Sequence, residues 1–118
     1  MSLSSIHRVR YFMSVAVLVL LGQTYSVFAS EAPDKAKMEL GKRVFTQTAV
    51  PSCGVCHTLN DAGTNGAIGA KLEEIQPDAK RVATAVRKGL GVMPPFAGKL
   101  TEEQIEAVAY YVSIASRK

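Results

Sequence analysis

The most apolar stretch of the chain lies near its N-terminus, at residues 11–21. Arg8 and Arg10 precede it without any acidic residue, a more polar segment follows at residues 22–26, and residues 27–29 read Val-Phe-Ala. A basic start, a short apolar run and a small-residue ending are typical of a secretory signal peptide. We therefore expect residues 1–29 to be a signal for export.

The alternative for this segment is a membrane anchor that stays attached. Such an anchor needs about 20 apolar residues to cross a bilayer, and this run is shorter and is interrupted at residues 22–24. The sequence therefore predicts cleavage after Ala29 and a mature domain of residues 30–118 that has no membrane span.

In the mature domain, apolar positions at helical spacing predict three helices, the first at residues 35–46. The second begins at Pro77, in the favoured first-turn position beside Asp78, and Gly89 is its expected C-cap. The apolar residues that define the three helices are Met38, Leu40, Val44 and Phe45, then Val82, Ala85 and Val86, and finally Ile105, Val108, Ala109 and Val112.

The third helix has a capping box at its start, with Thr101 as N-cap and Gln104 three residues later. Two long loops separate the helices, at residues 60–69, which contain three glycines, and at residues 90–99, which contain Met93-Pro94-Pro95-Phe96. Neither region has a convincing strand pattern. The expected fold class is all-α, with three main helices and two long loops that could wrap a flat ligand.

Length and charge limit the possible functions. The chain has 118 residues and a formal charge of +4, which falls to +2 when Arg8 and Arg10 leave with the signal. The mature chain holds one small domain, and no arginine-rich stripe with interleaved aromatics supports nucleic-acid binding. With few aromatics and no tryptophan the core is thin, so a buried cofactor would help to stabilise it.

The candidate chemistry lies in the segment Cys53-Gly54-Val55-Cys56-His57. Two cysteines three apart, followed at once by histidine, form the pattern that attaches one c-type haem through two thioethers and leaves the histidine as an iron ligand. One helical turn brings both thiols to the haem vinyl groups. Cys53, Cys56 and His57 are therefore predicted to bind haem c, with His57 on the iron.

Three other interpretations of this motif have less support. A redox dithiol would follow a strand in a βαβ pattern, and none is visible. A disulfide across two residues would close a very small loop and stabilise little. A zinc site needs four ligands, whereas the mature chain offers three.

The second axial ligand can be approached by elimination. His7 and Met13 belong to the predicted signal, and Met38 sits among core positions of the first helix. Met93 lies in a proline-bounded loop 36 residues after His57, far enough to reach the other face of a haem. We expect Met93 to bind the iron, which predicts one-electron transfer without an open site. The alternative, a haem enzyme or gas-binding protein, applies if Met93 is not a ligand.

With these features the mature chain resembles class I monohaem cytochromes c of the bacterial periplasm over essentially its whole length. The resemblance implies a periplasmic location and a crossing of the first and last helices. Gly41 and Phe45 match the family on one side of that crossing, and Tyr111, or less well Tyr110, on the other.

The resemblance also concerns the histidine. In the family a Gly-Pro-x-Leu segment follows the haem motif, and the carbonyl at the proline position accepts the histidine Nδ1 proton. This chain has Gly69-Ala70-Lys71-Leu72 instead. The family pattern therefore implies that the Ala70 carbonyl orients His57, without the rigidity of a proline ring.

More narrowly, the loops are similar to those of cytochromes that serve bacterial sulfite dehydrogenases. The matching segments are Cys56-His57-Thr58-Leu59, Asp61-Ala62-Gly63, Gly91-Val92-Met93-Pro94 and Phe96. In that group a molybdenum enzyme oxidises sulfite and passes electrons singly to the haem. The similarity implies an electron carrier, not an enzyme, with a sulfite dehydrogenase as donor and a downstream oxidase or cytochrome as acceptor.

A partner is expected to dock where the haem edge emerges. The residues predicted there are Val55, Ala67, Ile68 and Val92, with Arg87 and Lys88 nearby. The alternative for these six residues is ordinary core and solvated helix.

Overall fold

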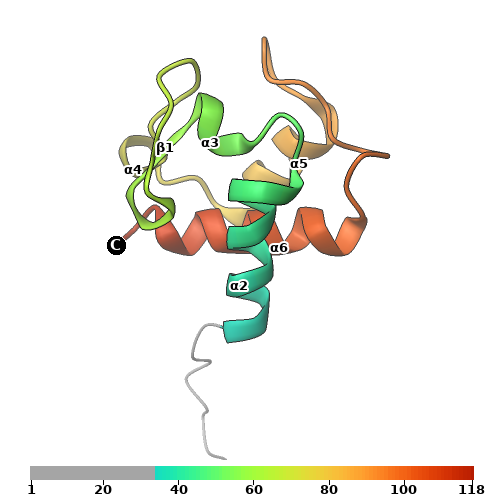
Figure 1. The fold of residues 1–118 in the computed structure, drawn as a ribbon, viewed down its shortest axis with the longest axis horizontal. Coiled ribbons are helices and arrows are strands. Elements are labelled where there is room, and N and C mark those ends of the chain that lie inside the picture. The colour runs from blue at the N-terminus through green and yellow to red at the C-terminus, as the bar shows by residue number, and fades with distance from the viewer. Residues whose placement is uncertain (1–33) are drawn as a thin grey trace, which may run out of the picture. The chain divides into compact units, whose positions relative to one another are not determined.

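The computed structural model describes residues 34–118 (Figure 1). The predicted signal peptide, residues 1–29, lies outside the described residues, as do His7, Met13 and the predicted cleavage site after Ala29. Three main helices, α2 (Lys35–Arg43), α5 (Ala79–Lys88) and α6 (Glu102–Ala115), carry the fold. The predicted all-α class is confirmed.

Short elements fill the connections between the main helices. They are a π-helix η1 (Val44–Thr48), α3 (Cys53–Cys56), β1 (Thr58–Leu59), a 3₁₀ turn η2 (Asn60–Ala62), β2 (Thr64–Asn65) and α4 (Leu72–Ile75). Among residues 34–118, no helix combines the length and apolar character needed to cross a membrane.

Helices α2 and α6 cross at Gly41, as the family pattern implied. A Cβ at this position would lie 2.2 Å from the Ala107 carbonyl oxygen and 2.5 Å from the Tyr111 Cβ, so only glycine allows this approach. The rings of Phe45 and Tyr111 pack edge to face, with centroids 6.1 Å apart. Tyr111 is therefore the aromatic of the crossing, whereas the hydroxyl of Tyr110 accepts the Asp34 N–H.

The first helix differs from its predicted end at residue 46. Its α-helical part stops at Arg43 and continues as η1 to Thr48. The hydroxyl of Ser52 donates to the carbonyls of Phe45 at 3.1 Å and Thr46 at 3.2 Å. Because these carbonyls find a side-chain donor, the wider π turn leaves them satisfied. Ser52 directly precedes Cys53, so the contact also fixes the cysteine turn to the first helix.

The second helix begins two residues later than predicted, at Ala79. Asp78 is its N-cap, and the carboxylate accepts the Arg81 N–H at 2.7 Å. Pro77 therefore lies before the cap, and a side-chain hydrogen bond at the cap explains the later start. The predicted cap at Gly89 is confirmed, with φ of +76°. The capping box of Thr101 and Gln104 on α6 is confirmed as well.

The absence of strands was predicted wrongly. Strand β1, directly before the expected loop of residues 60–69, and β2, within that loop, form a two-residue antiparallel hairpin that pairs Thr58 with Asn65 and Leu59 with Thr64. The turn between them is η2 followed by Gly63, whose φ is +66°. Strands this short show no alternating pattern in sequence, so the pattern could not reveal them.

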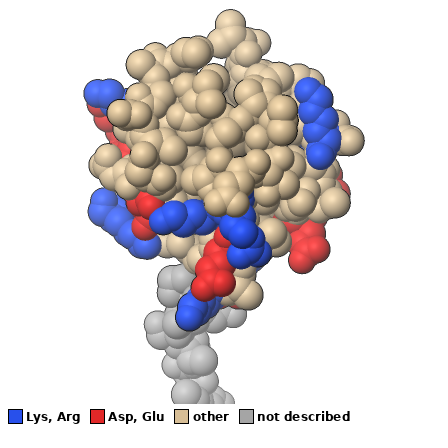
Figure 2. All heavy atoms as spheres, viewed as in Figure 1, with Lys and Arg blue, Asp and Glu red and all other residues tan. Residues whose placement is uncertain are grey.

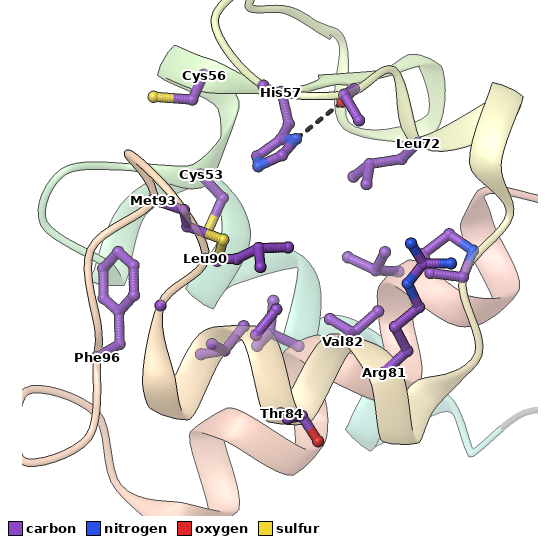
Figure 3. Close-up of a pocket in the computed structure, with 18 of the residues that line it drawn as sticks. Cys53, Cys56, His57, Leu72, Arg81, Val82, Thr84, Leu90, Met93 and Phe96 are labelled. Atoms are coloured by element: carbon purple, nitrogen blue, oxygen red, sulfur yellow. Dashed lines mark hydrogen bonds between the residues drawn. The ribbon is translucent and has the colours of Figure 1, made fainter.

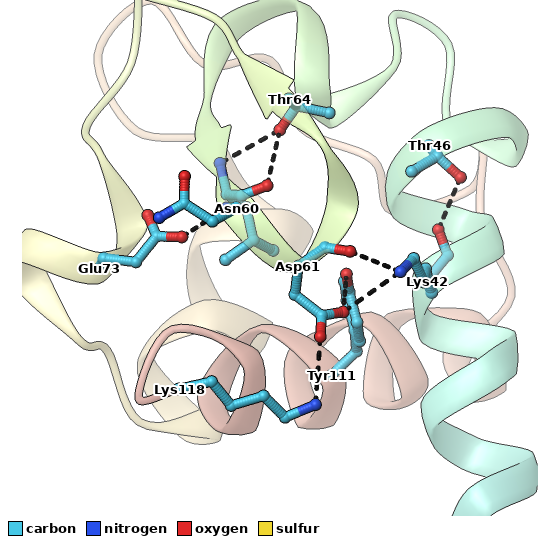
Figure 4. A network of polar contacts seen from close by, with 9 residues as sticks. Lys42, Thr46, Asn60, Asp61, Thr64, Glu73, Tyr111 and Lys118 are labelled. Atoms are coloured by element: carbon cyan, nitrogen blue, oxygen red, sulfur yellow. Dashed lines mark hydrogen bonds and ion pairs between the residues drawn. The ribbon is translucent and has the colours of Figure 1, made fainter.

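Asp61 connects both terminal helices to this hairpin (Figure 4). Its carboxylate accepts the Tyr111 hydroxyl at 2.8 Å and pairs with Lys42 at 3.4 Å and Lys118 at 3.1 Å. Burial raises the pKa of the Asp61 carboxyl, but the hydrogen bonds from Tyr111, Lys118 and Lys42 together outweigh burial, so the pKa is lowered. The carboxylate is therefore the charged anchor of the crossing.

Candidate functional site

A cavity of about 1230 Å³ lies between the cysteine turn, α5 and the loop that follows α5 (Figure 3). Its lining is mainly apolar, and its volume exceeds the range of about 300–1,000 Å³ typical of small-ligand pockets. All four predicted site residues line it, namely Cys53, Cys56, His57 and Met93. The structure therefore brings together residues that are up to 40 positions apart in sequence.

Helix α3 places Cys53 and Cys56 on one turn, where the His57 N–H donates to the Cys53 carbonyl at 2.9 Å. Both cysteines are free thiols in this structure, which gives no support to a structural disulfide. Burial is the main cause that raises the pKa of the Cys53 thiol to about 11, and Cys56 adds to it. A redox-active dithiol requires a lowered thiol pKa, so the site does not have the character of a thiol oxidoreductase.

The imidazole of His57 is held through its Nδ1 atom, which lies 2.8 Å from the Ala70 carbonyl oxygen. A carbonyl only accepts, so Nδ1 carries the proton and Nε2 has a free lone pair. Figure 3 shows the ring inside the cavity. The role implied for Ala70 is confirmed: the backbone carbonyl makes this contact without the proline of the family pattern.

Gly69 contacts the face of the same ring, a role that the sequence did not reveal. A Cβ on Gly69 would lie 2.5 Å from Cε1 and 2.7 Å from Nδ1 of His57. The Gly69 N–H donates to the Cys56 carbonyl at 2.7 Å, which fixes the glycine against the cysteine turn. The only signal of this contact in the sequence was that Gly69 directly precedes Ala70, whose carbonyl was expected to accept the His57 proton.

Met93 is held in a tight turn that starts at the end of α5. Leu90 and Met93 exchange two backbone hydrogen bonds of 3.1 and 3.0 Å, and Gly91 between them has φ of +59°. The Phe96 N–H donates to the Val86 carbonyl at 2.8 Å, which returns the loop to α5. Figure 3 shows the Met93 side chain in the same cavity as the His57 ring.

The apolar stripe of α5 is less buried than the sequence analysis expected of a core stripe. Of the predicted core positions on this helix, Val86 is buried, and Ala83 joins it. Val82 and Ala85 are only half-buried, and they line the cavity together with Val86. The apolar stripe therefore serves two surfaces, the contact with α6 and the wall of the site.

The chemistry of this site fits a covalently bound haem. Two thiols lie on one helical turn beside an apolar cavity of sufficient volume, and a histidine with a free Nε2 enters that cavity. Fold and site together define a monohaem class I cytochrome c with one haem c attached at Cys53 and Cys56. Proteins of this class carry electrons and are not enzymes.

Comparison with known proteins agrees with this class. The family model described as "Cytochrome C oxidase, cbb3-type, subunit III" matches residues 36–112, and the chain belongs to this family. Cytochrome c6 of Microcystis aeruginosa is 37% identical over 71 residues, which cover 57% of this chain and 88% of the relative. Cytochrome c6 of Gloeothece citriformis is 30% identical over 104 residues, which cover 83% and 86%.

A solved structure gives the fold comparison. The crystal structure of the c-type cytochrome SorU from Sinorhizobium meliloti is 46% identical in sequence and aligns with a TM-score of 0.68. The alignment covers 72% of this chain and 97% of SorU. The chain is therefore an electron-carrier c-type cytochrome that is similar to SorU.

Proposed function

We propose that His57 and Met93 are the two axial ligands of the haem iron. We also propose that the protein carries single electrons in the periplasm from a sulfite dehydrogenase to a downstream oxidase or cytochrome. The observation that carries the ligand assignment is the His57 ring, whose Nδ1 is held by Ala70 so that Nε2 enters the cavity that Met93 also lines. When bound, the haem supplies one-electron chemistry at its iron.

The described residues offer few alternatives to Met93. His57 is the only histidine of residues 34–118, and Met38 packs against the core from α2 without lining the cavity. Imidazole and thioether are neutral ligands, so they suit both ferrous and ferric iron, and the thioether raises the reduction potential. Their fixed positions keep the rearrangement between the two oxidation states small.

Absorption spectra of the haem-loaded protein test the ligand assignment. The oxidised protein should show a weak far-red band that reports sulfur ligation. Met93→Ala should lose this band, whereas Met38→Leu, the matched control outside the cavity, should keep it. Retention of the band in Met93→Ala, or ready binding of carbon monoxide by the ferrous wild type, would favour the alternative of an open-site haem protein.

Two similarities support the sulfite dehydrogenase as electron donor. The loop segments around Asp61-Ala62-Gly63 and Gly91-Val92-Met93-Pro94 are similar to those of cytochromes that serve such enzymes. The 46% identity with SorU extends over 97% of that chain. The likeness therefore includes the loops that surround the site as well as the helices.

An exposed apolar surface near the cavity is suited to brief docking. We call it the apolar rim: Val55 (61% exposed), Ile68 (69%), Leu90 (70%) and Val92 (86%). Figure 2 shows few charged side chains over α3 and the loop after α5, and more of them along α2 and α6. Contacts of redox partners are typically small and short-lived, and a surface with few charges predicts a docking rate that depends weakly on salt.

The charges expected beside this surface are not equivalent. Arg87 pairs with Glu102 at 2.8 Å and with Glu106, so its charge is largely compensated within the domain. Lys88 is exposed and has no ion pair within residues 34–118. Lys88 is therefore the one of the two that remains for an acidic group on a partner.

Rapid mixing of the reduced sulfite dehydrogenase with the oxidised cytochrome tests the partner. We expect fast haem reduction, slowed at least several-fold by Val92→Asp in the apolar rim. Ala36→Asp, which adds the same charge to the first turn of α2, is the control and should reduce at the wild-type rate. Slow reduction of the wild type at every ionic strength would exclude this donor and leave the fold and haem assignments intact.

The periplasmic location rests on the predicted signal of residues 1–29. Expression in a host that exports and matures c-type cytochromes should yield a periplasmic product whose mass equals residues 30–118 plus one haem. A product of full chain length in the membrane fraction would contradict this prediction.

A further inference from the structure

Thr64 of β2 joins the hairpin to the haem-attachment turn, residues 53–57, through its hydroxyl group. Its Oγ1 accepts the Leu59 N–H at 3.1 Å and donates to the His57 carbonyl at 3.0 Å. The Leu59 carbonyl, at 3.5 Å, is a more distant acceptor. Figure 4 shows the Thr64 hydroxyl turned toward the backbone of the hairpin. One side chain therefore satisfies two backbone groups, of which the Leu59 N–H belongs to a fully buried residue.

The methyl group of Thr64 occupies the space beside Gly54. A Cβ on Gly54 would lie 2.4 Å from Cγ2 and 3.0 Å from Cβ of Thr64. The first distance is far inside ordinary contact of roughly 3.5–4.0 Å. Gly54 directly follows Cys53, so the methyl group lies against the first of the two residues that separate the cysteines. This position must be glycine as long as residue 64 carries the methyl group.

A second contact holds the end of β2 on the same turn. A Cβ on Gly66 would lie 2.5 Å from the Cys56 carbonyl carbon and 2.7 Å from the His57 nitrogen. The backbone of Gly66 therefore lies directly on the peptide bond that precedes His57. The Thr58 hydroxyl donates to the Gly66 carbonyl at 3.0 Å and keeps the glycine there. The hairpin thus contacts the turn both at Thr64 and two residues later.

We propose that Thr64 is a positioning residue for His57 and acts through the backbone of the haem-attachment turn. The inference deepens the proposed function and rests on it only through His57 as an iron ligand. Ala70 and Gly69 hold the imidazole ring, whereas Thr64 holds the backbone from which that ring extends. Both sets of contacts are needed to keep Nδ1 within hydrogen-bond distance of its acceptor.

Loss of the Thr64 hydroxyl changes the backbone on both sides of Thr58. The Leu59 N–H is left without its acceptor in a buried position, and the His57 carbonyl loses its donor. The backbone of His57 then shifts, which weakens the hydrogen bond from Nδ1 to the Ala70 carbonyl. An imidazole with a weaker acceptor is a weaker donor to ferric iron, so the reduction potential rises.

Hydrogen exchange and redox titration of the haem-loaded protein test the role of the hydroxyl. Thr64→Val keeps the shape of the side chain and should give several-fold faster exchange of the Leu59 amide together with a higher reduction potential. Thr64→Ser retains the hydroxyl and should keep both quantities close to wild type. Thr48→Val makes the same chemical change at an exposed position outside the cavity and should alter neither.

A second set of variants tests the packing and remains informative if Thr64→Val does not fold. Gly54→Ala should raise the reduction potential and lower the yield of haem-loaded protein, because the new Cβ displaces the Thr64 methyl group. Thr64→Ser, added to Gly54→Ala, removes this methyl group and should restore most of both quantities. The remaining distance of 3.0 Å to the Cβ of residue 64 requires a shift of only a few tenths of an ångström.

Two outcomes would overturn the proposal. One is a wild-type reduction potential in Thr64→Val, whether or not the Leu59 amide exchanges faster. The other is a Gly54→Ala protein that is impaired equally with and without Thr64→Ser. The ligand is tested separately, because an iron-bound imidazole lies on the haem and its ring protons are shifted by the haem ring current. Absence of that shift for His57 in the ferrous wild type would refute the ligand, while Leu59 exchange would still report the hydroxyl contact.

Discussion

Gly69→Ala places one methyl group against the ring that is proposed to bind the iron. The new Cβ would lie 2.5 Å from Cε1 and 2.7 Å from Nδ1 of His57, about 1 Å inside ordinary contact of roughly 3.5–4.0 Å. The glycine cannot retreat easily because its N–H is bonded to the Cys56 carbonyl. The ring must therefore move, which stretches its 2.8 Å hydrogen bond to the Ala70 carbonyl beyond bonding distance.

The cost follows from that hydrogen bond. Its net contribution is about 1–1.5 kcal/mol, and about 1.4 kcal/mol corresponds to a factor of ten. In the ferrous protein we expect the His57 Nδ1 proton to exchange with solvent roughly tenfold faster in Gly69→Ala. The reduction potential should rise, because an imidazole without this acceptor is a weaker donor to ferric iron.

Proton exchange by nuclear magnetic resonance and redox titration measure the two effects. Ala70→Pro is the matched control, since it keeps the accepting carbonyl and should leave both quantities near wild type. If Gly69→Ala kept the wild-type exchange rate and potential, the contact between Gly69 and the ring would not govern the orientation of His57.

Three further predictions concern stability, each measured by denaturant unfolding of the haem-loaded protein. Gly41→Ala should destabilise the fold, because separating α2 from Ala107 costs about 1–3 kcal/mol and exceeds the helix-propensity gain of about 1 kcal/mol; equal stability would contradict this. Ser52→Ala should lower the free energy of unfolding by about 1 kcal/mol, because the carbonyls of Phe45 and Thr46 lose their side-chain donor. Thr101→Ser keeps a hydroxyl at the exposed N-cap of α6, so this control should change the stability little. The lowered pKa of Asp61 stabilises the fold above the pKa of the unfolded chain, and this stabilisation is lost as pH falls through the folded value. Asp61→Asn should therefore be less stable than wild type at neutral pH and show a smaller loss on acidification; parallel pH profiles would refute the role of the carboxylate.

Local features were readable from the sequence because their causes are local. The spacing of Cys53, Cys56 and His57 reflects covalent chemistry within one helical turn. The capping box of Thr101 and Gln104 and the cap at Gly89 depend on backbone groups a few residues away. Where the pattern failed locally, a competing short-range bond prevailed, as at Asp78, whose carboxylate begins α5 two residues after the predicted start.

Tertiary structure decided everything that depends on which surfaces meet. Val82, Ala85 and Val86 share one helical stripe that lines the cavity, yet only the packing of the folded chain buries Val86 and leaves the other two half-buried. Nothing in the sequence distinguishes the two arginines of α5, Arg81 and Arg87. In the fold, Arg87 forms ion pairs with Glu102 and Glu106, whereas the side chain of Arg81 has no ion-pair partner within residues 34–118.

The sequence by itself thus determined a three-helix domain, the attachment of haem c at Cys53 and Cys56, and the candidate ligands His57 and Met93. The contact of the Ala70 carbonyl with His57 was implied by the family pattern and is confirmed. Only the fold determined that Gly69 packs on the imidazole and that Arg87 pairs with Glu102 and Glu106 of α6. The physical reason is the range of the interactions. Covalent chemistry and helix caps act within a few residues, whereas packing and ion pairs join side chains that only the folded chain brings together.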